Sequence, residues 1–184
     1  MKTRLVKIHS STILHALAAM LPLTVALIIN ACILEGQTVN WYAPASPPPR
    51  AAPGWAYDAA TLTTVLFGGA GYGGVTYGDT WIWQNDWHQL SPPSSPSPRQ
   101  AHAMAYDGAA HNVVLFGGCS SNNVDTCTYL NDTWIWDGTT WTQQFPAQSP
   151  SPRATNMVYD AATKTVVLFG GANSSTDDLG DTWT

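Results

Sequence analysis

One five-residue phrase, Val-Leu-Phe-Gly-Gly, occurs three times in the chain and constrains its fold more than any other feature. The copies span residues 65–69, 114–118 and 167–171. A Tyr-Asp pair precedes each copy, and its aspartate lies ten positions before the first glycine every time. A fixed spacing inside a period of about 50 residues is the signature of a repeat architecture. The chain is therefore predicted to stack several copies of one small structural unit.

Three further elements are constant around the phrase: a Pro-Arg pair, the Tyr-Asp pair and an Asp-Thr-Trp triplet that follows the glycines. Their arginines, aspartates and tryptophans are Arg50, Arg99 and Arg153; Asp58, Asp107 and Asp160; and Trp81, Trp134 and Trp183. These landmarks divide the chain into repeats 50–98, 99–152 and a shorter 153–184.

Each repeat is predicted to contain four short strands. In the second repeat, residues 101–106 are rich in small side chains, and residues 112–118 form an unbroken apolar run that suits a strand buried on both faces. Residues 133–136 alternate with a period of two, so that the tryptophans share one face. Asp137-Gly138 is a hairpin signal before the strand that begins at Trp141. After residue 31 no stretch has helical spacing, so the chain is predicted to be all-β.

Four-stranded units of about 50 residues, apolar on both faces, are the blades of a β-propeller. The small residues of the first strand suit the position nearest the axis. The glycine pair, the preceding Tyr-Asp, the following Asp-Thr-Trp and the closing tryptophan resemble kelch repeats, as in the galactose oxidase-like propellers. The resemblance covers residues 41–184 and implies a kelch-type propeller.

The propeller is expected to be incomplete. Residues 32–49 form a lead-in whose Asn40-Trp41 and proline run resemble the end of a repeat, which predicts one orphan outer strand near Trp41. Two full blades and part of a third follow. A propeller closes with 4 to 8 blades, so we expect open sheet faces and a tendency of residues 33–184 to associate.

Residues 1–31 have the layout of a targeting segment. Lys2, Arg4 and Lys7 precede a mostly apolar stretch over residues 13–29, as in a secretory signal. Residues 29–32 resemble a bacterial lipobox, which implies lipidation of Cys32. Three outcomes stay open: a lipoprotein, a cleaved signal peptide and an uncleaved membrane anchor. All of them predict an exported chain, periplasmic or at the cell surface.

The charge pattern argues against nucleic acid as a partner. Beyond residue 31 the chain has only four of its seven basic residues and all twelve acidic ones. No basic stripe is available to neutralise phosphates.

The loops between the second and third strands are the most variable part of the repeat, which is typical of loops that carry function. From the second glycine to the next Asp-Thr-Trp the distances are 10, 14 and 10 positions. The kelch resemblance implies that these loops lie on the ligand-binding face. In the longest loop, Ser121, Asn122, Asn123 and Asp125 are candidate contacts.

Arg50, Arg99 and Arg153 are also candidate ligand residues, because guanidinium groups near the axis can hold a carboxylate or sulfate through paired hydrogen bonds. The alternative is structural, with each arginine bonded to backbone carbonyls of the preceding loop.

Three cysteines are present, and Cys119 and Cys127 lie in the long loop, where they are predicted to form a disulfide. This pairing leaves Cys32 as the odd cysteine, consistent with its lipidation.

An enzyme would need residues that break the repeat. His88, His102 and His111 occupy non-equivalent positions without metal-ligand spacing, and His102 is expected to be a packed core histidine. No cofactor, metal site or catalytic set is predicted. We therefore expect a binding module for a protein or a carbohydrate, with membrane attachment only through the N-terminus. The alternative is the N-terminal part of a kelch-type enzyme, galactose oxidase-like or sugar-isomerising, whose catalytic residues lie beyond residue 184.

Overall fold

The computed structural model describes residues 46–121, 127–174 and 177–184, all of which belong to one compact unit, Ala43–Thr184. Several sequence predictions lie outside these residues: the targeting segment 1–31, Cys32, the strand near Trp41, and Asn122, Asn123 and Asp125. Within the described part of the chain, no helix is long and apolar enough to cross a membrane.

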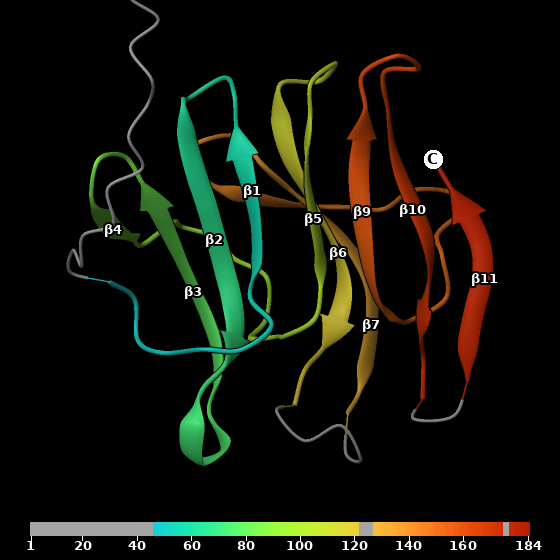
Figure 1. The fold of residues 1–184 in the computed structure, drawn as a ribbon, viewed down its shortest axis with the longest axis horizontal. Helices are drawn as coiled ribbons and strands as arrows, with labels where there is room; N and C mark the ends of the chain where they lie inside the picture. Colours follow the sequence, from blue (N-terminus) through green and yellow to red (C-terminus); the bar gives the residue numbers. More distant parts are fainter. Residues whose placement is uncertain (1–45, 122–126, 175–176) are drawn as a thin grey trace, which may run out of the picture. The chain divides into compact units, whose positions relative to one another are not determined.

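The fold consists of three antiparallel sheets, two with four strands and one with three (Figure 1). The first sheet contains β1 (Gly54–Asp58), β2 (Thr63–Ala70), β3 (Thr76–Trp83) and β4 (Trp87–Leu90). The second contains β5 (Ala103–Asp107), β6 (Asn112–Cys119), β7 (Tyr129–Trp136) and β8 (Trp141–Gln144). The third contains β9 (Ala154–Asp160), β10 (Thr165–Ala172) and β11 (Asp178–Trp183). Each sheet is one blade with its strands in sequence order, which confirms the predicted all-β, kelch-type architecture of two full blades and part of a third.

The first strands of the three blades lie together. In Figure 1, β5 stands between β1 and β9, and both neighbours contact it. These strands carry the small residues Ala56, Ala103 and Ala105. The inner position predicted for the first strand is therefore confirmed.

The Tyr-Asp aspartates shape the turn between the first two strands of each blade. Asp58 Oδ1 accepts hydrogen bonds from the backbone N–H groups of Ala60 (2.9 Å) and Thr61 (3.3 Å). Asp107 makes the equivalent pair of bonds, to Ala109 and Ala110. A carboxylate that caps its own turn in this way stabilises a tight reversal, so the role of these aspartates is structural.

Each sheet has two faces, which we name by the neighbour they meet. The forward face carries the phrase phenylalanine (Phe67, Phe116 or Phe169) and points to the next blade in sequence. The backward face carries the phrase leucine and points to the previous blade. The main core joins the forward face of the first blade to the backward face of the second; its buried members are Val65, Phe67, Met104, Val113, Leu115, Trp136 and Trp141.

One polar contact crosses this core and fixes its register. The indole Nε1 of Trp141, on the backward face of the second blade, donates to Thr80 Oγ1 of the first blade at 3.0 Å. The Phe67 ring packs edge-on against the same indole, with 5.5 Å between centroids. A buried indole with a partner for its N–H contributes apolar area without an unsatisfied donor.

The glycine pair makes close contact with the next blade possible. Gly69 N donates to the Arg99 carbonyl at 2.8 Å, and Gly118 N donates to the Arg153 carbonyl at the same distance. Gly68 has a φ of +63°, and a Cβ there would lie 2.4 Å from the Arg99 carbonyl oxygen. Only glycine combines the left-handed backbone with this approach, so the phrase ends in glycines because blades must meet there.

Candidate functional site

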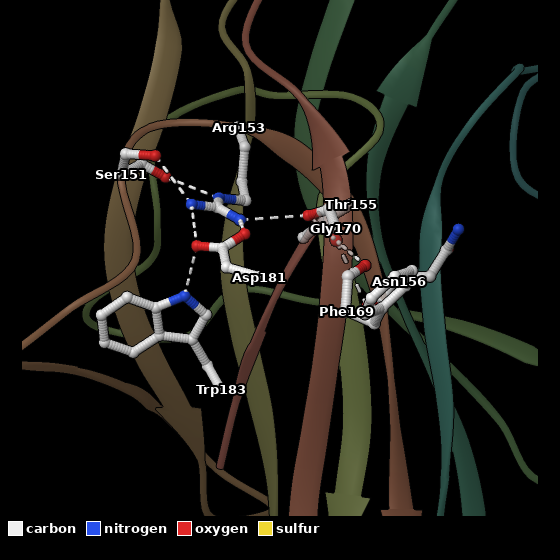
Figure 2. Close-up of polar contacts among 8 residues, drawn as sticks. All are labelled: Ser151, Arg153, Thr155, Asn156, Phe169, Gly170, Asp181 and Trp183. Atoms are coloured by element: carbon white, nitrogen blue, oxygen red, sulfur yellow. Dashed lines mark hydrogen bonds and ion pairs between the residues drawn. The ribbon is translucent and has the colours of Figure 1, made fainter. Parts of the chain in front are cut away.

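A network of arginine, aspartate and tryptophan recurs in every blade. Arg99 forms a two-point ion pair with Asp132, Nη1 to Oδ1 at 2.6 Å and Nη2 to Oδ2 at 2.8 Å. The indole of Trp134 donates to the same carboxylate at 2.7 Å. The equivalent groups are Arg50, Asp79 and Trp81 in the first blade and Arg153, Asp181 and Trp183 in the third. Figure 2 shows the third copy.

The remaining guanidinium donors are also used inside the protein. Arg99 Nη1 donates to the Gly117 carbonyl at 3.0 Å, and Nε and Nη2 donate to the Ser97 carbonyl and hydroxyl. Arg153 has the same five bonds through Gly170 and Ser151. Since Arg99 is fully buried and its five N–H donors are all satisfied, the structural alternative is favoured over the ligand-binding hypothesis for these arginines.

Arg50 differs from its two equivalents. Proline replaces serine at position 48, so that only a carbonyl is available there, and Arg50 Nε donates to it at 3.1 Å. Its guanidinium also stacks over the Tyr77 ring, 4.1 Å from the centroid. A cation over an aromatic face is stabilised by the ring quadrupole, which again assigns Arg50 to the scaffold.

The ion pairs also set the charge of the aspartates. Burial alone would raise the pKa of the Asp132 carboxyl, but the hydrogen bonds from Arg99 and Trp134 hold that pKa below its usual value. At Asp79, burial likewise raises the pKa, but the hydrogen bonds from Arg50 and Trp81 hold that pKa below its usual value. In the third blade, the bonds from Arg153 and Trp183 lower the pKa of Asp181. All three carboxyls are therefore ionised at neutral pH.

A cavity of about 410 Å³ lies where the inner strands begin, on the axial side of all three blades. Its walls combine small apolar residues, polar side chains and one phenyl ring. They are Ala52, Pro53, Ala101, His102, Ala154, Thr155, Asn156, Phe169 and Gly171. Because β2 runs antiparallel to β1, this end of the blades is also the end that carries the loops between the second and third strands.

The polar wall of the cavity consists of residues that break the repeat. Gly54, Ala103 and Asn156 occupy one equivalent position, since each pairs with the phrase phenylalanine of its own blade. The residues directly before them, Pro53, His102 and Thr155, form a second set of equivalent positions. The arginines, aspartates, tryptophans and glycines of the repeated motifs are constant between blades, whereas these residues differ, as expected of residues that contact a ligand.

His102 is the most unusual residue of the wall. It is only 4% exposed, and neither ring nitrogen has a hydrogen-bond partner among the residues that the structure describes. Burial, followed by the nearby Arg99 charge, lowers the pKa of His102 to about 3, so the imidazole is neutral. Its ring packs edge-on against Phe67, at 5.6 Å between centroids. The predicted core packing of His102 is therefore found, together with a place in the cavity wall.

Two alanines at the cavity have strained backbones. Ala52 and Ala101 have φ values of 47° and 53°, in the left-handed region that costs a non-glycine residue about 1–2 kcal/mol. Ala101 N donates to the Ala52 carbonyl at 2.9 Å, which joins the two strained segments. The third repeat has one residue fewer between its arginine and Tyr159. Strain of this kind is concentrated at functional sites.

The loop rim around this end carries two further features. Tyr72, at the tip of the first loop, is fully exposed. In the second loop, Cys119 and Cys127 form a disulfide, and Gln100 Nε2 donates to the Ser121 carbonyl at 2.6 Å. Of the four predicted ligand contacts in this loop, Ser121 lies within the described residues. Its carbonyl accepts the hydrogen bond from Gln100, which lies next to the cavity residue Ala101.

Across residues 46–121, 127–174 and 177–184, no group of three or more His, Cys, Asp or Glu side chains is arranged to hold a metal ion.

The sequence reasoning missed the cavity wall, apart from His102. Pro53, Thr155 and Asn156 do not belong to any motif, and the predicted candidates were the constant arginines and the longest loop. A signal was present: these residues break an otherwise regular pattern of small side chains in the inner strands.

Comparison with known proteins identifies the repeats independently. The model of the KLHDC2/KLHL20/DRC7 Kelch-repeats domain matches residues 30–184. Among solved structures, the chain is similar to the one titled "Structure of YjhT", with a TM-score of 0.59 and 17% sequence identity over 77% of this chain. The similar region covers 44% of that structure, so the chain spans less than half of its length. No curated protein matches the chain in a sequence comparison.

Proposed function

We propose that this chain, which belongs to the KLHDC2/KLHL20/DRC7 Kelch-repeats domain family, is a binding module. It binds a segment of a partner protein in the axial cavity. The observation that carries the proposal is the cavity of about 410 Å³, whose polar wall differs from blade to blade while the arginine–aspartate–tryptophan network is constant. Its size is within the ordinary range of ligand pockets, about 300–1,000 Å³.

The chemistry of the wall suits a neutral or weakly polar peptide segment. The exposed amide of Asn156 offers hydrogen-bonding groups, while Pro53 and Phe169 offer apolar contact. Figure 2 shows the Asn156 side chain pointing away from the Arg153 network, so that it is not part of the scaffold bonds. Tyr72 supplies an exposed aromatic contact at the rim, and tyrosine is enriched where proteins bind each other.

We also propose that the chain is exported and held at a membrane by a lipid on Cys32. Support comes from the basic and apolar pattern of residues 1–31 and from the disulfide at Cys119, a bond that persists in oxidising compartments. Mass spectrometry of the mature protein tests this proposal. We expect a chain that begins at an acylated Cys32, and an intact residue 1 or an unmodified Cys32 would contradict it.

Photo-crosslinking tests the binding site. A photoreactive side chain at Asn156 should crosslink to a partner protein when the full chain is expressed in its own host. The same group at Thr139, in the turn at the other end of the second blade, should not. Asn156→Trp, which fills the cavity, should abolish copurification of the crosslinked partner, while Thr139→Trp should leave it unchanged. Crosslinking from Thr139 alone, or retention of only immobilised glycans, would overturn the proposal.

A further inference from the structure

One pair of positions in the second blade differs from its equivalents in both of the other blades. In each blade, the residue after the motif arginine is paired with the residue after the two glycines. The pairs are Ala51 with Ala70, Gln100 with Cys119 and Ala154 with Ala172. Both alanines are therefore replaced together in the second blade, by residues whose side chains can form bonds.

The backbone at this place does not require the two larger side chains. Ala51 and Ala70 exchange two backbone hydrogen bonds of 2.8 Å, and Gln100 and Cys119 exchange equivalent bonds of 2.9 and 2.8 Å. The residue that follows is a left-handed alanine in both blades, with φ values of 47° and 53°. Since a pair of alanines supports the same geometry in the first blade, the glutamine and the cysteine serve a purpose other than the fold of the pair.

Both side chains are bonded to the loop between β6 and β7. Gln100 Nε2 donates to the Ser121 carbonyl at 2.6 Å, and Cys119 forms the disulfide with Cys127. We call these two bonds the clasp. The clasp ties the loop, at Ser121 and at Cys127, to the segment with which the second blade begins.

The clasp lies directly beside the wall of the axial cavity. Gln100 precedes Ala101 and His102, which both line the cavity. A Cβ added to Gly118, the residue before Cys119, would lie 2.7 Å from His102 Cβ and 2.8 Å from the Gln100 carbonyl oxygen. The backbone that leads to Cys119 is therefore packed tightly against the wall segment. Because close-packed groups transmit displacements to each other, a shift at Cys119 would move the wall.

We propose that the clasp positions the second-blade wall of the axial cavity, with Gln100 as a positioning residue, and that release of the clasp weakens partner binding. The inference rests on the proposed function and adds how the binding site is held in shape. A wall that is fixed before binding loses less conformational entropy when the partner binds, which increases affinity.

Hydrogen exchange of the full chain measures whether the clasp holds the wall. Gln100→Ala removes one bond, and the double variant Cys119→Ala with Cys127→Ala removes the other. At positions 100 and 119 these substitutions restore the alanines of the other two blades, so the fold should persist, as circular dichroism can verify.

The amides at positions 100 and 101 provide the readout, because both donate to backbone carbonyls in the folded chain. In each variant their protection factors should fall at least about tenfold, as expected of a local opening. The matched control is the pair of amides at Ala51 and Ala70, which have equivalent bonds and no clasp. Their protection should be unchanged.

Reduction by dithiothreitol provides an independent release of the disulfide. The sulfurs of Cys119 and Cys127 each gain one electron and one proton, while the dithiol closes into a cyclic disulfide. Once thiol titration finds both sulfurs reduced, the unaltered chain should lose as much protection as the double alanine variant. The double variant itself should not respond to the reagent.

Photo-crosslinking from position 156, in the third-blade wall of the cavity, connects the clasp to binding. The yield of crosslinked partner should fall at least about fivefold in both clasp variants, since a fivefold loss of affinity corresponds to about 1 kcal/mol. Gln89→Ala, which changes an exposed glutamine on the outer strand β4, should leave the yield unchanged.

The outcomes separate the two proposals. Unchanged protection at positions 100 and 101 in both variants would overturn the clasp, and so would faster exchange with full retention of the partner. If the unaltered chain captures no partner from position 156, the proposed function fails. The exchange measurement then still decides whether the clasp holds the wall.

Discussion

The arginine–aspartate pair illustrates how a single residue supports a blade. Arg99 reaches from the segment before β5 to Asp132 on β7, across the intervening strand β6, whose Gly117 carbonyl it also binds. A buried guanidinium that loses its counter-charge leaves an uncompensated charge in a low-dielectric interior, which is far more costly than loss of a surface ion pair.

Asp132→Asn is therefore expected to lower the free energy of unfolding by at least about 2 kcal/mol, because Arg99 stays buried without a compensating charge. Urea denaturation followed by circular dichroism measures the change. The matched control is Asp178→Asn, which removes one charge from an exposed position on β11 and should change stability by less than about 0.5 kcal/mol. Equal effects of the two substitutions would show that the network is not structural.

His102 makes the stability of the protein depend on pH. The pKa of His102 is lowered from 6.5 to about 3 in the folded chain, so the unfolded chain binds a proton that the folded chain does not. The free energy of unfolding therefore falls as the pH falls from about 6.5 towards 3. The loss should be about 2 kcal/mol between pH 7 and pH 5.

His102→Leu should remove this part of the pH dependence. Urea denaturation of both proteins at pH 7 and pH 5 provides the comparison. Contributions of His88 and His111 to the pH dependence cancel because both proteins retain these residues. The stabilising contribution of the aspartates with lowered pKa values is lost only at more acidic pH. An unchanged difference between pH 7 and pH 5 in the variant would contradict the assignment.

At the scale of the strand, the glycine pair determines how closely blades approach. Gly117→Ala adds a Cβ that would lie 2.6 Å from the Arg153 carbonyl oxygen, in a backbone with φ of +64°. Gly73 has a similar φ of +75°, but nothing lies within 4 Å of a Cβ added there. Comparison of alanine substitutions at the two glycines therefore separates the effect of backbone strain from that of the clash between blades.

Gly73→Ala should cost about 1 kcal/mol, the ordinary price of a left-handed alanine. Gly117→Ala should cost at least about 2 kcal/mol more, since the carbonyl of the next blade has to move. Urea denaturation of both variants measures the difference. Equal costs would mean that the contact with Arg153 does not constrain the spacing of the blades.

Strand-level features of the fold were predictable, whereas most of the candidate site was not. The phrase around Phe67 predicts a buried strand because an unbroken apolar run needs cover on both faces, and Asp137-Gly138 predicts a turn because its backbone requirement is local. The Arg99–Asp132 bond joins residues 33 positions apart, and no local pattern reports such a pairing. The cavity depends on how three inner strands converge, so Asn156 becomes recognisable only once the blades are in register.

At the scale of the whole molecule, equivalent residues have unequal roles because the blades have unequal neighbours. Phe67 is fully buried between the first two blades, while Phe169 is 65% exposed at the same position of the third. In repeat proteins, stability is approximately the sum of the units and their interfaces. The loss of unfolding free energy on substitution should therefore depend on whether a neighbouring blade covers the residue, and not on its position in the repeated motif.

Phe67→Ala should lower the free energy of unfolding by about 3–5 kcal/mol, as for a phenylalanine removed from a packed core. Phe169→Ala should cost less than about 1 kcal/mol, because this side chain is largely exposed. Thermal unfolding of dilute protein compares them. Similar costs would show that Phe169 is buried within its own chain.

The indole pair at the first interface also has an optical consequence. Trp136 and Trp141 are each 1% exposed, and their ring centroids are 5.3 Å apart at an angle of 45°. Two indoles this close, held at a fixed tilt, couple their electronic transitions and produce a paired circular-dichroism band that an isolated indole lacks. Trp136 lies on β7 and Trp141 on β8, where they are paired across the two strands, and Trp83 and Trp87 form the equivalent pair in the first blade at 5.5 Å. Loss of these outer hairpins would erase the band. The protein therefore carries an intrinsic chromophore that reports on its outer strand pairs without any added label.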